Sequence, residues 1–220
     1  LPIVSKNIFK NVTVFEAVRC FPYFTNKFTF DNISYNKLQS LNIDDTAFAF
    51  TYMGNSPSLN DILTKCFRQD NATAKEIKIN NFILLNPPDD FILLNPPDDA
   101  EDIKFSNFKI ICFNFNFNPN NVFRINAGIV IENCAEIELI KFSDCVFTKA
   151  LHIENSVKKI NCLSLNNIKN FKPISLNNTI TKLIGLELCD INYNDNLFDK
   201  QNNILMGLNV LKLNNVRHDP

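Results

Sequence analysis

Seven cysteines and two histidines are the side chains of this chain best suited to nucleophilic catalysis or metal binding. A catalytic thiolate needs a histidine or another cationic neighbour, and structural zinc sites use closely spaced cysteine pairs. Here the spacing is wide and no Cys-x-x-Cys pair occurs: Cys20, Cys66, Cys112, Cys134, Cys145, Cys162 and Cys189. We therefore expect no metal site and no cofactor, and interpret the cysteines as reduced, small apolar side chains of a core.

The histidines and acidic pairs give little support for acid–base chemistry. His152 lies in an alternating apolar–polar segment, at a position expected to face solvent, and His218 lies near the C-terminus. Adjacent carboxylates occur in turn-like or proline-rich surroundings, which favours solvated loops: Asp44–Asp45, Asp89–Asp90 and Asp98–Asp99. With only 4 glycines, the chain has no glycine-rich phosphate loop. We therefore expect that the protein is not an enzyme.

A repeat identifies the elements that must position any functional residue. The segment 156–168 matches the segment 179–191, 23 residues later. Both follow the template apolar-x-x-apolar-x-apolar-x-x-apolar. Two further copies are Ile137, Ile140, Phe142 and Cys145, and Leu208, Leu211, Leu213 and Val216. A period of about 20–29 residues with this spacing is typical of a leucine-rich-repeat solenoid.

A second alternating segment occurs in the same repeats. Its three copies are Ile129–Asn133, Leu151–Asn155 and Ile174–Asn178. Alternation with period two indicates a half-buried strand, so each repeat holds two extended segments, one on each side of the solenoid. The predicted fold class is α/β or mainly β. Parallel strands stack at a period of roughly 23–27 residues, within the range of leucine-rich repeats, behind an irregular N-terminal cap.

Upstream, the template continues at intervals of about 36 residues, which exceed the usual repeat length. The predicted copies are Ile110, Phe113 and Phe115; Ala74, Ile77 and Ile79; and Leu38, Leu41 and Ile43. One interval contains a tandem duplication of a nonapeptide, Phe82–Asp90 followed by Phe91–Asp99. Removing one copy returns that interval to the usual repeat length. We therefore predict a solenoid over residues 31–220 with an inserted, duplicated loop at 82–99, preceded by a separate segment at 1–30.

Composition limits the partners. A formal net charge of −1 argues against nucleic acid as the main partner. The stretch Asp89–Asp102 carries six acidic and no basic residues, which fits either a solvated loop or a docking loop for a basic partner. No apolar run reaches the length of a membrane span. The 36 asparagines fit turns after repeat strands, where their side chains hydrogen-bond exposed backbone groups.

The segment 137–145, Ile-Glu-Leu-Ile-Lys-Phe-Ser-Asp-Cys, resembles the cysteine-containing subclass of leucine-rich repeats, Leu-x-x-Leu-x-Leu-Ser-x-Cys. That subclass is typical of F-box–leucine-rich-repeat proteins. Leu1-Pro2, Ile8-Phe9 and Glu16-Ala17 resemble a degenerate F-box. The resemblance implies a cytoplasmic substrate adaptor of a cullin–RING ubiquitin ligase. Its Leu1, Pro2, Ile8 and Phe9 would dock on a Skp-type linker protein. An irregular cap over the first repeat is the alternative for this segment.

Residues 153–160 also resemble the BspA-like repeat group, which implies a secreted or cell-surface protein that binds a host or environmental ligand. Four glycosylation sequons are compatible with that alternative: Asn11, Asn32, Asn71 and Asn177. Under both hypotheses the repeat face binds a partner. Strand alternation predicts that the residues between the apolar ones form one exposed row, Lys141, Ser164, Glu187 and Lys212.

Overall fold

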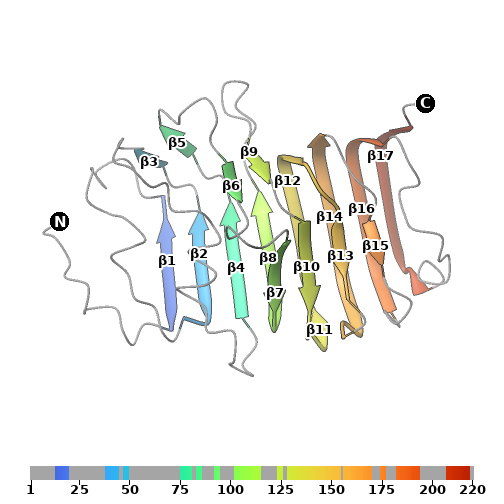
Figure 1. Cartoon of the computed structure of the whole chain (residues 1–220), viewed down its shortest axis with the longest axis horizontal. Coiled ribbons are helices and arrows are strands. Elements are labelled where there is room, and N and C mark those ends of the chain that lie inside the picture. Colours follow the sequence, from blue (N-terminus) through green and yellow to red (C-terminus); the bar gives the residue numbers. More distant parts are fainter. Residues whose placement is uncertain are drawn as a thin grey trace, which may run out of the picture.

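A computed structural model describes the strands of a parallel β-solenoid (Figure 1). The described residues are 13–19, 38–44, 47–49, 75–80, 83–85, 92–94, 102–114, 123–125, 128–154, 156–169, 174–176, 182–193 and 207–218. Within these ranges the regular elements are strands, and none is an α-helix. Of the two predicted fold classes, the mainly β solenoid is therefore the one observed.

The larger sheet has 11 strands, and every pairing in it is parallel. Its main path follows chain order: β1 (Val14–Val18), β2 (Ser40–Asp44), β4 (Lys75–Asn80), β8 (Phe108–Asn114), β12 (Leu139–Phe147), β14 (Lys159–Lys169), β16 (Lys182–Tyr193) and β17 (Val210–His218). Beside this path lie β6 (Ile92–Leu94), β9 (Phe123–Ile125) and β11 (Glu136–Ile137). Each successive coil adds one strand to the path.

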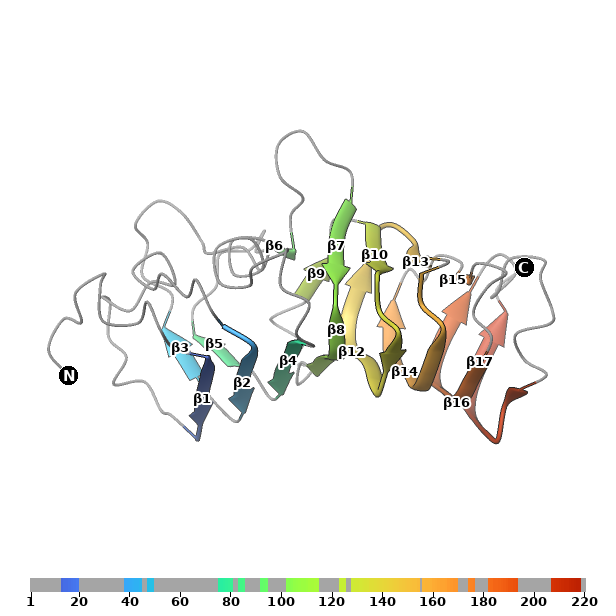
Figure 2. The same cartoon turned by 90° about the horizontal axis from the view of Figure 1, so that it is seen from below.

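A smaller sheet lies on the opposite side of the solenoid (Figure 2). Its four parallel strands are β7 (Asp102–Ser106), β10 (Gly128–Glu132), β13 (Leu151–Ile153) and β15 (Ile174–Leu176). The predicted second strands are confirmed, since Ile129 pairs with Leu151 and Leu151 with Ile174. A separate pair joins β3 (Ala47–Ala49) to β5 (Ile83–Leu85).

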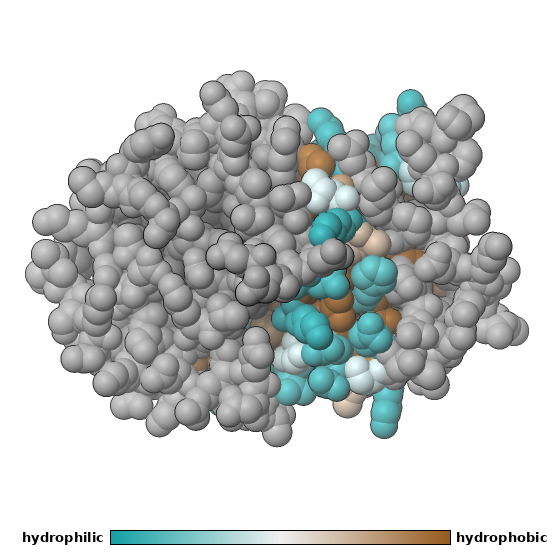
Figure 3. Space-filling view, in the orientation of Figure 1, coloured by the Kyte–Doolittle hydropathy of each residue, from teal (hydrophilic) through white to brown (hydrophobic). Residues whose placement is uncertain are grey.

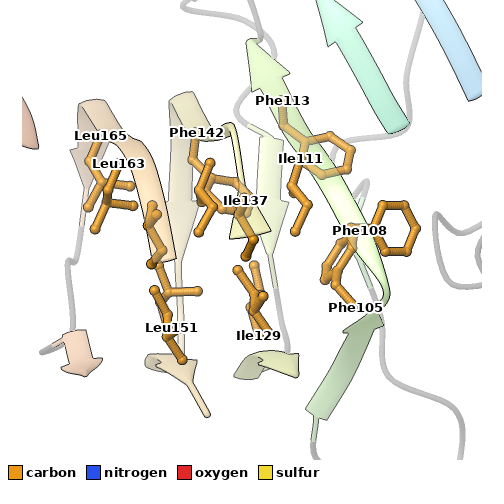
Figure 4. Close-up of a cluster of buried hydrophobic side chains, with 14 of the residues drawn as sticks. Phe105, Phe108, Ile111, Phe113, Ile129, Ile137, Phe142, Leu151, Leu163 and Leu165 are labelled. Atoms are coloured by element: carbon orange, nitrogen blue, oxygen red, sulfur yellow. The ribbon is translucent and has the colours of Figure 1, made fainter. Parts of the chain in front are cut away.

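The predicted register of the C-terminal repeats is confirmed. Leu163 pairs with Ile140 on one side and with Leu186 on the other, and Leu186 pairs with Leu211. The residues two positions later pair in the same order: Phe142, Leu165, Leu188 and Leu213. On β12, β14 and β16 these side chains are buried, and Figure 4 shows those of Phe142, Leu163 and Leu165 in one interior with Ile129 and Leu151. Burial against the next coil therefore fixes the stack.

The last strand departs from this burial. Leu211 and Leu213 occupy core positions in the register, yet they are 55% and 58% exposed. Within the described residues no strand follows β17 in the sheet. Among the described strands, β16 alone therefore packs against Leu211 and Leu213.

Phenylalanines fill the interior where the two sheets face each other. Phe113 stacks on Phe142 of the next coil with ring centroids 5.6 Å apart, and Phe142 meets Phe147 edge to face at 5.3 Å. From the smaller sheet, Phe105 meets Phe108 edge to face at 5.4 Å (Figure 4). Such aromatic pairs add about 0.5–1.5 kcal/mol each beyond the burial of their area.

A left-handed residue bends each of the long strands. Asp144, Asn167, Asp190 and Asn215 have φ angles of 58°, 49°, 51° and 51°. Aspartate and asparagine adopt this conformation more readily than other non-glycine residues. The bend interrupts the alternation of faces, so that Phe142 and Cys145, three positions apart, are both buried. The final x-x gap of the repeat template is therefore this corner.

The predicted upstream register needs one correction. Ile77 and Ile79 pair with Ile111 and Phe113, which in turn pair with Ile140 and Phe142. The sequence pattern aligns Phe113 with Ile140, whereas in the structure Phe113 pairs with Phe142, two positions later in the template. The alignment of Ile110 shifts by the same two positions. Phe115 lies outside the described residues. Phenylalanine alternates with asparagine from 113 to 117, and a slip of two residues keeps every side chain on its face, so the pattern alone does not define the register.

The two copies of the duplicated nonapeptide pair with different coils. Ile83–Leu85 of the first copy forms β5 and pairs with β3, whereas Ile92–Leu94 of the second copy forms β6 and pairs with β9. β9 pairs in turn with the end of β12. The proline pairs of both copies lie outside the described residues. Two identical sequences, both between β4 and β8 in the chain, thus pair with strands of the preceding and of the following coil.

The predicted N-terminal segment 1–30 is described only at residues 13–19, where β1 pairs in parallel with β2. Glu16 and Ala17 of the F-box resemblance lie in this strand. Leu1, Pro2, Ile8 and Phe9 lie outside the described residues.

Candidate partner-binding surface

The predicted surface residues form one row across the outer face of the larger sheet. Lys141 pairs with Ser164, Ser164 with Glu187, and Glu187 with Lys212. The register extends the row in the other direction through Cys112, Lys78, Asn42 and Glu16. Consecutive members lie on adjacent strands, about 4.8 Å apart. We call this set the charged row.

An ion pair organises the C-terminal end of the charged row. The Lys212 ammonium donates a hydrogen bond to the Glu187 carboxylate over 2.5 Å. This hydrogen bond lowers the pKa of Glu187 and raises the pKa of Lys212. Ser164 also hydrogen-bonds Glu187, and it is only 7% exposed although the alternation predicts an exposed residue. Its hydroxyl is therefore shielded by its neighbours in the row.

An apolar row lies beside the charged row, two positions earlier on each strand. The register aligns Ile110, Leu139, Cys162, Gly185 and Val210. Leu139 and Cys162 are half-buried, and Val210 is 44% exposed. The sequence prediction missed this row. Adjacent apolar residues such as Leu139-Ile140 and Cys162-Leu163 signal it, since neighbours in a strand point to opposite faces.

A ladder of amides and carboxylates lies on the other side of the charged row. Asn80 donates a hydrogen bond from its amide to Asp44 over 2.7 Å, and Asn114 donates one to Asn80. The next residue in register, Ser143, is fully buried, and its hydroxyl has no hydrogen-bond partner. The hydrogen bonds donated by Asn80 and Asn114 join three consecutive coils, and they stiffen the face beside the charged row.

Ion pairs also line the beginning of the strands. Lys159 of β14 donates a hydrogen bond to Glu136 of β11 over 2.5 Å, and this contact lowers the pKa of Glu136. The Lys109 ammonium and the Glu138 carboxylate lie 2.9 Å apart, and the hydrogen bond between them raises the pKa of Lys109. The apolar row is therefore bordered by charged groups on both sides.

The described cysteines are free thiols: Cys112, Cys134, Cys145, Cys162 and Cys189. Burial raises the pKa of Cys112, Cys145 and Cys162, and the hydrogen bond to Asp190 raises that of Cys189. A raised pKa favours the protonated thiol, which is a weak nucleophile and a weak metal ligand. Among the described residues, no group of three or more histidine, cysteine or acidic side chains is placed to bind a metal.

The smaller sheet presents a different outer face. His152 lies between buried Leu151 and Ile153, in register with Val130 and half-buried. Ser106 of the neighbouring coil donates a hydrogen bond to Glu132 over 2.9 Å. On the face drawn in Figure 3, hydrophilic residues predominate among those described. Of the acidic stretch 89–102, the described positions are 92–94 and Asp102, which begins β7.

Neither a membrane-spanning helix nor a similarity to a known protein gives further information about this surface. The described part of the chain has no helix with the length and apolar character of a membrane span. No known protein family matches the chain, and no curated protein or solved structure does either.

Proposed function

We propose that this chain is a non-enzymatic scaffold that binds a protein partner on the outer face of its larger sheet. The observation that supports this proposal is the alignment of the apolar row beside the charged row. Protein interfaces combine an apolar centre with a polar rim, and the two rows provide both on one regular surface. Lys141, Glu187 and Lys212 supply charges of both signs, which suits a protein surface better than a phosphate backbone.

Affinity capture with a triple variant tests this face. Replacing Lys141, Glu187 and Lys212 together with alanine should reduce partner recovery at least tenfold, because the polar contacts beside the apolar row are lost. The matched control replaces Lys104, Glu132 and His152 of the smaller sheet with alanine, and it should retain recovery. Equal recovery by both triple variants would refute this binding face.

We further propose that the partner is a ubiquitination substrate and that the chain is a cytoplasmic adaptor. The support is the resemblance of residues 137–145 and of the N-terminus to F-box–leucine-rich-repeat proteins. Ile8→Asp combined with Phe9→Asp should then abolish association with a Skp-type linker protein while substrate capture persists. Retained association with the linker would contradict the adaptor proposal and leave the scaffold proposal intact.

The alternative is a secreted or surface-attached repeat protein, favoured by the four sequons and by the BspA-like segment. Mass spectrometry of the protein from its source cell distinguishes the two proposals. Glycans on Asn11, Asn32, Asn71 or Asn177 would establish passage through the secretory pathway. Unmodified asparagines at all four positions would favour the adaptor.

A further inference from the structure

Lys141 differs from the other lysines on and beside the outer face of the larger sheet in its lack of an ionic partner. Four of those lysines form ion pairs over 2.5 to 3.2 Å: Lys78 with Glu76, Lys109 with Glu138, Lys159 with Glu136, and Lys212 with Glu187. In the part of the chain that the structure describes, Lys141 donates no hydrogen bond and forms no ion pair. Its ammonium is therefore open to an anion from another molecule.

The register neighbours of Lys141 supply no negative charge. They are Cys112 on β8 and Ser164 on β14. Burial raises the pKa of Cys112, and the Lys141 ammonium offsets only part of that rise, so this thiol is neutral near pH 7. The nearest described carboxylate in the charged row is that of Glu187, two strands or about 9.6 Å away, and it pairs with Lys212. The charge of Lys141 is therefore not neutralised within the row.

The position of Lys141 makes this missing charge costly. Its side chain is half-buried, as is that of Lys109. Taking a charged group partly out of water costs free energy unless an opposite charge replaces the lost hydration. Glu138 provides that charge for Lys109, whereas Lys141 lies in the middle of the face without one. A carboxylate that reaches Lys141 therefore gains a charge-assisted hydrogen bond without displacing an internal partner.

Apolar side chains lie directly beside this ammonium. Leu139 precedes Lys141 by two positions on β12, so the two side chains share one face about 6.6 Å apart. Ile110 and Cys162 flank Leu139 in the apolar row. Leu139 and Cys162 are half-buried, so part of each side chain is open to contact from outside. An unpaired cation and an apolar surface thus lie next to each other on neighbouring strands.

We propose that the outer face binds an acidic partner protein, whose carboxylate pairs with Lys141 and whose adjacent apolar side chain packs on Leu139 and Cys162. This inference rests on the proposed function, because it names the chemistry of the partner for the same face. A carboxylate fits the site better than a phosphoryl group does. One ammonium neutralises one negative charge, whereas a phosphoryl group carries about 1.5 to 2 charges and favours clusters of arginines.

Zero-length cross-linking of the complex with the captured partner tests the contact directly. A carbodiimide joins an amine to a carboxylate only where the two groups touch. Mass spectrometry should identify an amide between Lys141 and an aspartate or glutamate of the partner that lies next to a large apolar residue. Lys109 and Lys212 should instead form amides with Glu138 and Glu187 of their own chain, which shows that the reaction reports contacts. Lys141→Arg keeps the charge but forms no amide, so it should retain the partner without the cross-link.

Matched substitutions measure the contribution of the charge. Lys141→Met removes the ammonium and keeps most of the apolar stem, and it should reduce partner recovery about tenfold. Its melting temperature should stay the same or rise, because an unpaired, half-buried charge is removed. Lys109→Met also removes a half-buried lysine of this region, but one that is paired inside the chain, and it should retain recovery. Melting curves verify that each variant is folded.

The outcomes separate this inference from the proposed function. If the triple alanine variant loses the partner but Lys141→Met retains it, the inference is overturned and the binding face stands. An absence of amides from Lys141 in the captured complex would also overturn it, as would amides only to a second copy of this chain. If the triple alanine variant retains the partner, or the wild type captures none, the binding face is refuted and this inference with it.

Discussion

Asn167 donates a hydrogen bond from its side-chain amide to the carboxylate of Asp144 in the preceding coil, over 2.7 Å. Both residues have positive φ angles and lie at the corner where their strands bend. Asn215 and Asp190 repeat the arrangement two coils later, again over 2.7 Å. Asparagine and aspartate thus serve two purposes at one position, since they tolerate the left-handed backbone and they link neighbouring coils.

Substitutions at the corner should separate these two purposes. Asn167→Val forces a β-branched residue into the left-handed region and should lower the free energy of unfolding by about 1–3 kcal/mol. Asn167→Gly loses the same hydrogen bond but removes the backbone strain, so its loss should be smaller. Denaturant unfolding measures both. Asn166→Val, at an extended position next to the corner, is the control, and equal losses for Val and Gly at 167 would refute the account of the corner.

The stacking of coils makes Leu186 and Leu211 a matched pair, since they are register partners on β16 and β17. Leu186 is 1% exposed, so Leu186→Ala should destabilise the fold by about 2–5 kcal/mol. Leu211→Ala removes the same atoms from an open position and should cost about 0.5 kcal/mol or less. Urea titration measures the two changes, and losses of the same size would contradict the burial of Leu186 or the exposure of Leu211.

The duplicated nonapeptide allows an unusual deletion, because removing Phe82–Asp90 or Phe91–Asp99 gives the same sequence. The remaining copy then lies between β3 and β9, and we expect the solenoid to persist. The deletion brings the register partners Ile77 and Ile111 closer in sequence, to the same separation as Leu186 and Leu211. A soluble protein with one cooperative melting transition is the expected result. Loss of cooperative unfolding would show that both copies are required.

The Glu187–Lys212 pair should give stability that depends on pH in the acid range. Lys212 lowers the pKa of Glu187 below its ordinary value of 4.5, so the folded protein keeps this carboxylate charged where the unfolded chain protonates it. The contribution is present in full above that ordinary value and is lost as the pH falls through the lowered pKa. Glu187→Gln should therefore be less stable than the wild type near neutral pH, by a margin that shrinks in acid.

That margin is expected to be small, because the Lys212 side chain is 68% exposed and water screens the pair. Denaturant titrations from neutral to acid pH measure the free energies of unfolding of the wild type and of Glu187→Gln, and their difference is this margin. Lys212→Met should reduce the same margin at neutral pH. A margin that stays constant across the titration would show that the pair adds no pH-dependent stability.

The sequence predicted the C-terminal coils correctly because burial acts there with one spacing. Ile140, Leu163 and Leu186 recur at 23 residues with the same alternation, so only one register buries them all. Lys75 shows what the template could not predict. It occupies the register position of Phe108 with 2% of its surface exposed, and its ammonium lies 5.8 Å from the centroid of the Phe108 ring. A buried cation over an aromatic ring depends on neighbours distant in sequence.

The surface was predictable in part for similar reasons. Alternation placed Lys141, Ser164 and Glu187 in one row, but the shielding of Ser164 depends on side chains of neighbouring coils. The exposure of Leu213 was not predictable, because its sequence context matches that of buried Leu188. Whether such a leucine is buried or exposed depends on the position of its strand in the stack.

Site-specific photo-crosslinking tests the binding face most directly. A photoreactive residue at position 141, on the outer face of the larger sheet, should yield a covalent complex with the captured partner. The same residue at position 104, on the smaller sheet, should yield little. Mass spectrometry of the two samples compares the yields. Predominant crosslinking from position 141 is the result that the account predicts, whereas equal or greater yield from position 104 would contradict it.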